Sequence, residues 1–385
     1  MSGTTTHFAG SGDAGSGGAN LPTRFRRHAD SIERAGRSPL SVALMRGAAD
    51  DIESGGVLED LLSGIPLPAG QAPALRVLAA LHRTVLEGRA PGLDPYYPSV
   101  GGTLAPDDVW AVAEATLREN SDYVHRCLER GVQTNEPGRS TALFGVLLWL
   151  NERYRRPIRL FEIGASAGLN LLATDFAYRV QGTLLGRDDS PVVFEEPWIS
   201  LPVPDPISAD RDLVVVDRRG CDVAPIDAAS VDGRITLMSY IWPDEPERMF
   251  RMRAALSVAE MKPPVVDEES ADTWLARMLP SSRDDSVRLV WQSVMTQYLT
   301  SEIRSAISDQ IDLAGAAANE EGPVVYAKME PATHPVPSFQ VGLSCWPGGT
   351  DRTLAHAGDH GPPVRWVGEG IDQSAGGVTK RPGRA

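Results

Sequence analysis

The most constraining feature of this sequence is a change of hydrophobic period in the middle part of the chain. Upstream of it, apolar residues recur at the spacing of a buried helical face, as they do from Phe25 to Ile32. The run from Ile158 to Ile163 is instead short and apolar with β-branched ends, which predicts a buried strand. We therefore expect a helical region over residues 21–155 and an α/β region over residues 156–370.

The second region alternates strand-like runs with helical patterns, which implies βαβ units and a largely parallel sheet. After the first run, the predicted strands are 191–195, 213–217, 235–240, 264–267, 287–291 and 323–328. The predicted helices include 246–259, 271–279 and 300–313. The last two runs, 338–345 and 363–367, have no helical pattern between them and predict an antiparallel hairpin. The expected fold is an α/β, Rossmann-like, mostly parallel sheet with an antiparallel C-terminal hairpin, preceded by a helical region.

Composition and charge exclude several classes of protein. The formal net charge of −14 opposes binding to a phosphate backbone, so we expect a small-molecule substrate and no nucleic-acid partner. The most apolar run, Ala142 to Leu150, is about half as long as a membrane-spanning helix, which predicts no membrane insertion. The three cysteines are widely spaced and lack a CxxC pair, which favours a reducing, cytoplasmic location. Residues 1–20 and 371–385 are predicted to be disordered tails.

A glycine turn follows the first predicted strand, with the sequence Glu162-Ile163-Gly164-Ala165-Ser166-Ala167-Gly168-Leu169-Asn170. In an open parallel sheet, ligands bind beyond the carboxyl ends of the strands, where this turn is expected to lie. Gly164 and Gly168 permit a tight turn and a close approach of the backbone to a ligand. Glu162 adds a carboxylate, which suits a cationic, amine-bearing ligand and repels a pyrophosphate.

Other interpretations of the glycine turn stay open. The pattern Gly164-x-Ser166-x-Gly168 also matches the GxSxG nucleophile elbow of serine hydrolases. His334, His356 and His360 follow Ser166 in the chain order that a hydrolase triad requires. Against this, such an elbow normally follows several strands, and here only helices are predicted before it. The dinucleotide pattern GxGxxG fails at two positions, and a turn without any ligand is a further alternative.

No metal site is expected. His356 and His360 have the i, i+4 spacing of metal ligands, but glycine and proline around them predict a loop. The two imidazoles would therefore not share a helical face. The remaining chemistry of the chain is concentrated at the glycine turn.

Several blocks of the sequence together resemble one bacterial family. These blocks are Ser38-Pro39-Leu40, Tyr96-Tyr97-Pro98-Ser99, Val132-Gln133-Thr134-Asn135-Glu136, Glu162 to Leu171, and Ile241-Trp242-Pro243-Asp244-Glu245-Pro246-Glu247-Arg248. They resemble the bacterial domain of unknown function numbered 2332, over about Thr23 to Val367. The glycine turn is also similar to motif I of class I S-adenosylmethionine-dependent methyltransferases, with Ser166 in place of a more usual glycine. That similarity implies a methyltransferase-type core with S-adenosylmethionine as cofactor.

The methyltransferase similarity implies a set of site residues. The cofactor-binding residues would be Glu162, Gly164, Ala165, Ser166, Gly168 and Asn170. The second strand should end in an acid that binds the ribose hydroxyls, and we expect Asp222, with Asp217 as the alternative. The usual place for this acid, Tyr178 to Glu195, is predicted to be an inserted β-hairpin. Candidate contacts to the methyl acceptor, from loops expected over the cofactor, are Tyr97, Gln133, Asn135, Glu136, Arg139, Trp242 and Gln292.

The implied acceptor loop departs from a common methyltransferase pattern. It consists of Trp291-Gln292-Ser293-Val294 rather than the Asn/Asp-Pro-Pro-Tyr of many amino methyltransferases. Methylation of a nucleic-acid base or of a glutamine nitrogen is therefore not implied. Because methyl transfer depends mainly on positioning and electrostatics, few dedicated catalytic residues are expected. The leading hypothesis is a small-molecule methyltransferase, and the alternative within the same fold is a catalytically degenerate binding module.

Overall fold

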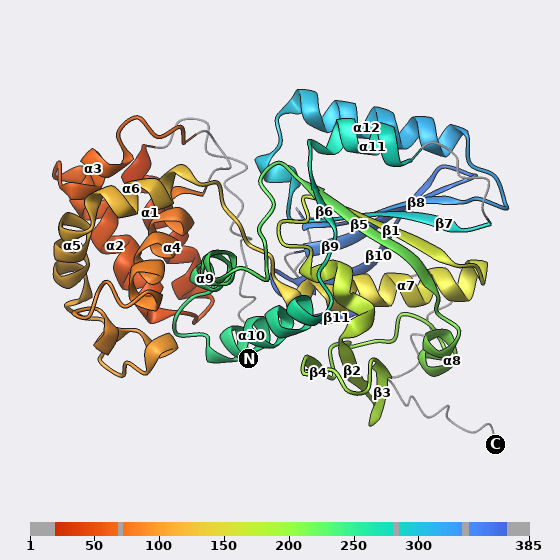
Figure 1. The fold of residues 1–385 in the computed structure, drawn as a ribbon, viewed down its shortest axis with the longest axis horizontal. Helices are drawn as coiled ribbons and strands as arrows, with labels where there is room; N and C mark the ends of the chain where they lie inside the picture. The colour runs from red at the N-terminus through yellow and green to blue at the C-terminus, as the bar shows by residue number, and fades with distance from the viewer. Residues whose placement is uncertain (1–19, 68–71, 280–284, 333–338, 368–385) are drawn as a thin grey trace, which may run out of the picture.

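The chain folds into two lobes that lie side by side (Figure 1). The computed structural model describes residues 20–67, 72–279, 285–332 and 339–367, so the predicted tails lie outside the described residues apart from Asn20. The helices of the first lobe are α1 (Leu21–Arg34), α2 (Pro39–Glu53), α3 (Val57–Leu62), α4 (Pro73–Leu86), α5 (Val109–Glu119) and α6 (Ser121–Glu129). Two short 3₁₀ turns, η1 (Asp94–Tyr96) and η2 (Pro98–Val100), connect α4 to α5. The prediction of a helical region before the first strand is confirmed.

Buried apolar stripes hold the helical lobe together. α1 begins after Asn20, whose side chain accepts a hydrogen bond from the Thr23 amide at 3.1 Å and so caps the first turn. Phe25 and Ile32 are buried on its inner face, as their helical spacing predicts. Within the described ranges, no helix of either lobe is both long and apolar enough to cross a lipid bilayer.

An eight-stranded sheet forms the centre of the α/β lobe. Its strands are β1 (Ile158–Ile163), β5 (Val215–Asp222), β6 (Val266–Glu268), β7 (Val287–Ser293), β8 (Val324–Pro331), β9 (Phe339–Trp346), β10 (Thr350–Gly358) and β11 (Gly361–Trp366). Their spatial order is β11-β10-β9-β8-β7-β1-β5-β6. The five strands from β8 to β6 are parallel, and β9, β10 and β11 pair in antiparallel fashion. The mostly parallel sheet is confirmed, whereas the C-terminal hairpin gains a third strand, β10, between its two predicted strands.

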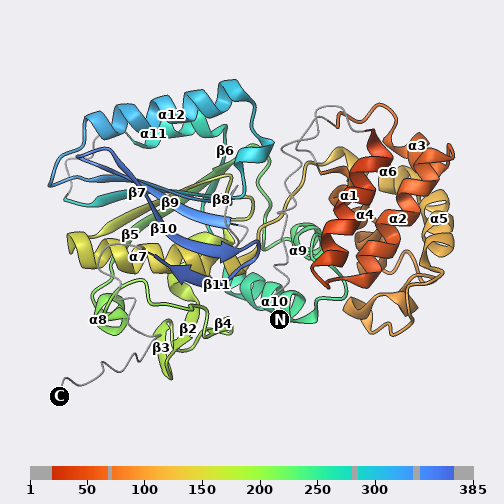
Figure 2. The same ribbon diagram turned by 180° about the vertical axis from the view of Figure 1, so that it is seen from behind.

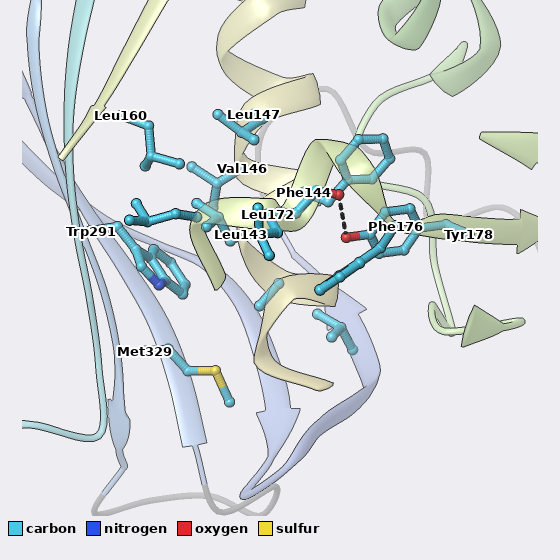
Figure 3. Close-up of a cluster of buried hydrophobic side chains, with 14 of the residues drawn as sticks. Leu143, Phe144, Val146, Leu147, Leu160, Leu172, Phe176, Tyr178, Trp291 and Met329 are labelled. Carbon is cyan, nitrogen blue, oxygen red and sulfur yellow. Dashed lines mark hydrogen bonds between the residues drawn. The ribbon is translucent and has the colours of Figure 1, made fainter. Parts of the chain in front are cut away.

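Helices cover both faces of this sheet (Figures 1 and 2). α7 (Ser140–Tyr154) lies on one face, and α11 (Ala271–Met278) and α12 (Ser301–Ala316) lie on the other. Successive side chains of β1 enter the two cores alternately, because Leu160 belongs to the core beneath α7 and Phe161 to the opposite core. Figure 3 shows Leu143 and Leu147 of α7 on the same face of the main sheet as Leu160 of β1. The alternation places the Glu162 side chain on the α7 face as well.

A small three-stranded sheet is inserted between β1 and β5. It consists of β2 (Ala177–Val180), β3 (Thr183–Gly186) and β4 (Val193–Glu195), in the order β3-β2-β4. β2 and β3 form an antiparallel hairpin, which confirms the predicted insertion, and β4 pairs in parallel with β2. The insertion, followed by α8 (Pro206–Arg211), explains why the second strand of the main sheet lies so far along the chain.

One predicted strand is a helix. Instead of a strand over residues 235–240, the chain forms α9 (Val231–Ser239), followed by α10 (Pro246–Met261). Ser230 caps α9 by accepting a hydrogen bond from the Gly233 amide at 2.9 Å. A short apolar run fits either period, so the cap and the tertiary packing decide between them. α9 packs against α4 and thereby joins the two lobes (Figure 1).

Candidate functional site

The carboxyl ends of three neighbouring strands meet beside the glycine turn. After β1, the chain builds β5 and β6 on one side of it and then returns to build β7 and β8 on the other side. Such a reversal leaves a crevice beyond the strand ends, where ligands bind in open α/β sheets. Glu162 lies near the end of β1, Asp222 ends β5, and Gln292 lies near the end of β7. The topology therefore brings three of the predicted site residues to one edge.

Packing accounts for both glycines of the turn. Gly164 and Gly168 have φ angles of +66° and +71°, in the left-handed region that side chains disfavour. A Cβ atom at Gly164 would overlap the side chain of Met295, and one at Gly168 would lie 2.7 Å from the Cβ atom of Pro264. The Ala165 amide donates to the carbonyl of Cys221 in β5 at 3.0 Å. After Gly168 the chain forms only a 3₁₀ helix, η4 (Leu169–Asp175), in place of the expected α-helix.

The segment Val132–Glu136 holds the glycine turn from the side of the helical lobe. The Ser166 hydroxyl donates to Oε1 of Gln133, whose Nε2 donates to the carbonyl of Ala224 at 3.1 Å. Oδ1 of Asn135 accepts from the Leu169 amide at 2.9 Å. Two of the sequence blocks singled out above thus meet in space, and Gln133 and Asn135 are tied to the turn rather than free to contact an acceptor.

Glu162 is a buried carboxylate with an unused oxygen. Its residue is 1% exposed, and Oε1 accepts a long hydrogen bond, 3.4 Å, from Nδ2 of Asn170. Oε2 of Glu162 and Oδ1 of Asn170 are both buried without a hydrogen-bond partner. Burial raises the pKa of Glu162 to about 8, although Asn170 and the charge of Arg139 oppose that shift. Buried polar atoms are rarely left unpaired, so these two oxygens mark a place where a donor is missing.

Arg139 is a buried cation near Glu162. It ends the 3₁₀ turn η3 (Pro137–Arg139), is 6% exposed, and its Nε donates to the carbonyl of Asp359 at a distance of 3.4 Å. Among the described residues, no carboxylate lies within ion-pair distance of it. Burial lowers its pKa, while the charge of Glu136 has the opposite effect. Arg139 therefore carries a buried charge that the protein itself leaves largely unpaired.

Glu136, by contrast, has a full set of structural partners. Its Oε1 accepts from the Gly138 amide at 3.0 Å, and its Oε2 accepts from Nε of Arg248 at 2.9 Å. Burial alone would raise the pKa of Glu136, but the charges of Arg248 and Arg251 and the hydrogen bonds from the Gly138 amide and Arg248 together outweigh burial, so the pKa is lowered. Arg248 also pairs with Glu245. The structure therefore places Glu136 in an ion-pair network that connects η3 to α10.

Asp222 is the acid that ends the second strand. Its Oδ2 accepts from the Ser166 amide at 2.8 Å, and its Oδ1 accepts from the Ala224 amide at 3.0 Å. The alternative, Asp217, lies near the start of β5 and faces Arg159 at 3.6 Å. Of the two acids, Asp222 is the one that ends β5, and its contact with a ribose stays a prediction.

A second carboxylate, that of the half-buried Glu330, lies at the ends of β7 and β8. Oε1 of Glu330 accepts from the Met295 amide at 3.0 Å, from the Thr296 amide at 3.2 Å and from Nε2 of Gln292 at 2.7 Å. Oε2 of Glu330 is buried without a partner. Oε1 of Gln292 accepts from the Tyr326 hydroxyl, so its amide is fixed. Glu330 was not predicted from the sequence, although an acid at the end of an apolar strand is the same signal that identified Glu162.

Two of the predicted acceptor contacts lie away from the turn. Tyr97 is buried in the core of the helical lobe, with its ring 5.6 Å from that of His82. Trp242 packs against the same core and lies between Arg37, 4.9 Å from its ring centre, and the ring of His360. Tyr97 therefore belongs to the helical core and Trp242 to the contact between the lobes, and no contact among the described residues joins either of them to the glycine turn.

The histidines do not join Ser166. Ser166 has a φ of 53° and donates its hydroxyl to Gln133. His356 lies in β10 and His360 in the following turn, and neither is hydrogen-bonded to Ser166, while His334 lies outside the described residues. In the described part of the chain, only helices and 3₁₀ turns precede β1, and no group of histidine, cysteine and acidic side chains is arranged to hold a metal ion.

The fold and the site together define a two-lobed α/β protein with a glycine turn at the switch point of a mostly parallel sheet. The chain belongs to the family described as "Uncharacterized protein conserved in bacteria (DUF2332)", whose model matches residues 23–366. The match confirms the family that the sequence blocks resemble. No curated protein and no solved structure matched the chain.

Proposed function

We propose that this protein is an S-adenosylmethionine-dependent methyltransferase that acts on a small molecule. The observation that carries the proposal is the buried carboxylate of Glu162, whose Oε2 lacks a donor beside the glycine turn. Oδ1 of Asn170 lacks a donor as well. Because both free atoms are acceptors when Glu162 is ionised, a complementary ligand must bring N–H or O–H groups, and an α-ammonium group brings three.

The strand order supports the same ligand class. Numbered in chain order, the parallel strands β1, β5, β6, β7 and β8 lie in the spatial order 3-2-1-4-5. This is the order of doubly wound folds that bind nucleotides at the switch point beside the first strand. In such folds an acid near the second strand binds ribose hydroxyls, and Asp222 ends that strand here. The carboxylate of Asp222 retains lone pairs beyond its two backbone hydrogen bonds.

Positioning is the task that falls to the protein. Bound S-adenosylmethionine supplies a methyl group on a positively charged sulfur. Glu162 and Asn170 would hold the ammonium end of the cofactor, and Asp222 would hold its ribose. At the other side of β1, Oε2 of Glu330 would accept a hydrogen bond from an O–H or N–H group of the methyl acceptor. Holding two reactants in one geometry is the largest contribution that such a site can make.

A catalytically degenerate binding module is the alternative within the same fold. It would bind the cofactor through the same residues and release no methylated product. Transfer of a labelled methyl group to a mixture of small molecules, dependent on Glu162, distinguishes the enzyme from the module.

Calorimetric titration of the purified protein with S-adenosylmethionine and S-adenosylhomocysteine tests the cofactor. Glu162→Gln should weaken binding of both by about tenfold or more, because a buried hydrogen bond to a charged group is worth roughly 1.5–3 kcal/mol. Glu87→Gln is the matched control, since Glu87 pairs with Arg83 and Arg89 in the helical lobe and should leave binding unchanged. Absence of binding at millimolar ligand would contradict the proposal.

The pH dependence of this binding provides a second, independent readout. Because burial raises the pKa of Glu162 to about 8, most of the carboxyl is protonated at neutral pH. An ammonium ligand favours the ionised form, so binding displaces the proton. The affinity for S-adenosylmethionine should therefore rise as the pH approaches 8 from below, by at most about tenfold per pH unit. Glu162→Gln should lack this rise, and an identical pH profile in both proteins would argue against contact between Glu162 and the ammonium.

A further inference from the structure

Arg139 differs from two neighbouring classes of enclosed arginine in the α/β lobe. The half-buried Arg248 forms ion pairs with Glu136 and Glu245, and the half-buried Arg218 pairs with Asp175. The buried Arg288 donates two hydrogen bonds to the carbonyls of Leu279 and Gly322. Arg139 is 6% exposed, yet the one hydrogen bond of its side chain is the 3.4 Å contact to the carbonyl of Asp359. A guanidinium has five donors, so most of the hydrogen-bonding capacity of Arg139 is unused.

The position of Arg139 connects this unused capacity to the glycine turn. The 3₁₀ turn η3, which ends in Arg139, packs against η4, which carries Asn170. The charge of Arg139 acts on the carboxylate of Glu162, yet the two side chains form no ion pair with each other. A buried cation with free donors therefore lies near a buried carboxylate and an amide oxygen, Oδ1 of Asn170, that both lack donors. A zwitterionic ligand is complementary to this arrangement, because its anionic group can accept hydrogen bonds from the free donors and its cationic group can donate to the free acceptors.

The energetics favour an anionic ligand group at Arg139. A buried charge without an ion-pair partner is costly, and the charges of Glu136 and Asp359 offset that cost only in part, because burial still lowers the pKa of Arg139. Planar guanidinium groups bind carboxylates through two parallel hydrogen bonds, which is a stronger interaction than a single neutral hydrogen bond. A ligand carboxylate would therefore satisfy Arg139 in the way that Glu136 satisfies Arg248.

We infer that Arg139 binds the α-carboxylate of the ligand whose α-ammonium group binds Glu162, so that the pair recognises an amino-acid head group. The inference rests on the proposed function, in which that head group is the methionine end of S-adenosylmethionine. Arg139 is then a specificity-determining residue of the cofactor site, and not a contact to the methyl acceptor as the sequence had suggested.

Comparing S-adenosylmethionine with its decarboxylated form tests the inference on the unmodified protein. Calorimetry should show the decarboxylated ligand binding at least tenfold more weakly, since it lacks the group that Arg139 holds. Arg139→Gln should lower the affinity for S-adenosylmethionine to that of the decarboxylated ligand, and should leave the affinity for the decarboxylated ligand unchanged. Arg139→Lys should give an intermediate loss, because lysine keeps the charge but lacks the planar fork.

The outcomes separate this inference from the proposed function. Equal binding of the two ligands by the unmodified protein overturns the role of Arg139 and leaves the methyltransferase proposal standing. Equal weakening of both ligands by Arg139→Gln also overturns it, because that result indicates a structural role. If neither ligand binds the unmodified protein, the proposed function fails and the inference fails with it. Arg83→Gln is the control, since it alters a buried arginine of the lobe interface and should not change the ratio of the two affinities.

Discussion

The interface between the lobes and the glycine turn both bury charged side chains, and they treat them in opposite ways. At the interface, Arg83 donates to Glu87, to the Tyr123 hydroxyl, and to Thr236 and Asp232 of α9. Both ring nitrogens of His82 also have partners, the Ser99 hydroxyl at 2.8 Å and the carbonyl of Ser239 at 3.2 Å. At the turn, Glu162, Asn170 and Arg139 each keep unused polar atoms.

The contrast shows that burial alone does not identify a functional site in this protein. Two arginines of nearly equal exposure, Arg83 at 7% and Arg139 at 6%, differ in how many of their donors have partners. A charged side chain with a structural role finds its hydrogen-bond and ion-pair partners within the fold. A charged side chain that binds a ligand lacks such partners until the ligand supplies them. The protein without ligand should therefore be less stable than the protein with a ligand bound at the turn.

The largest expected difference between the two regions is in the pH dependence of stability at Glu162. Its folded pKa of about 8 lies above the ordinary glutamate value of 4.5, so the folded state binds more protons between these values. The free energy of unfolding should fall as the pH rises through this window, by at most roughly 1.4 kcal/mol per pH unit. Glu162→Gln should remove the fall and be more stable than the unmodified protein at pH 8. Denaturant titrations at several pH values measure this, and parallel profiles would contradict it.

His82 should show the opposite dependence over a narrower window. Burial lowers its pKa from 6.5 to about 4, so the unfolded state binds more protons between these values. Stability that is present above pH 6.5 should decrease as the pH falls towards 4. Between pH 4.5 and 6.5 the terms from Glu162 and His82 oppose each other. The same titrations on Glu162→Gln should therefore reveal the His82 slope, and on His82→Gln they should reveal the Glu162 slope.

Removing each arginine tests the comparison directly. Arg83→Met should destabilise the protein by about 2 kcal/mol, because it removes four hydrogen bonds and leaves Asp232 and Glu87 with one ion-pair partner fewer each. Arg139→Met should be neutral or stabilising without ligand, since it removes a buried charge that has no counterion. Chemical denaturation of both variants at pH 7 provides the measurement. A similar loss of unfolding free energy in both variants would mean that both arginines stabilise the fold, which would contradict the comparison.

The smallest effect is expected at Ser166. Its hydroxyl is committed to Gln133 and no histidine is bonded to it, so a fluorophosphonate probe should not label it. Mass spectrometry of the treated protein, with Ser166→Ala as the control, decides the point. Specific labelling of Ser166 would make the turn a nucleophile elbow and would favour the hydrolase over the methyltransferase.

Residue patterns within short stretches of sequence predicted those parts of the site that lie within one such stretch. The strand before Gly164 follows from its apolar run, whereas the next strand was predicted over 213–217 and in the structure extends to Asp222. The α9 segment was predicted as a strand because a run of six apolar and polar residues does not distinguish the helical period from the strand period. Packing against α4 favours the helix. The unpaired state of Arg139 and of Glu162 could not be predicted, because it depends on which partners the tertiary structure fails to bring near them. Glu330 was missed although it carries the same local signal as Glu162, an acid at the end of an apolar strand.

The position of α9 has a consequence for the order in which the protein is completed during synthesis. The helical lobe is encoded first, yet α4 packs against α9, and Trp242 packs against the helical core. Both come after two strands of the main sheet in the chain. While the ribosome is still making the glycine turn, the helical lobe exposes the apolar and charged surface that will later receive α9. The lobe that emerges first therefore finishes packing only after the α/β lobe is partly built.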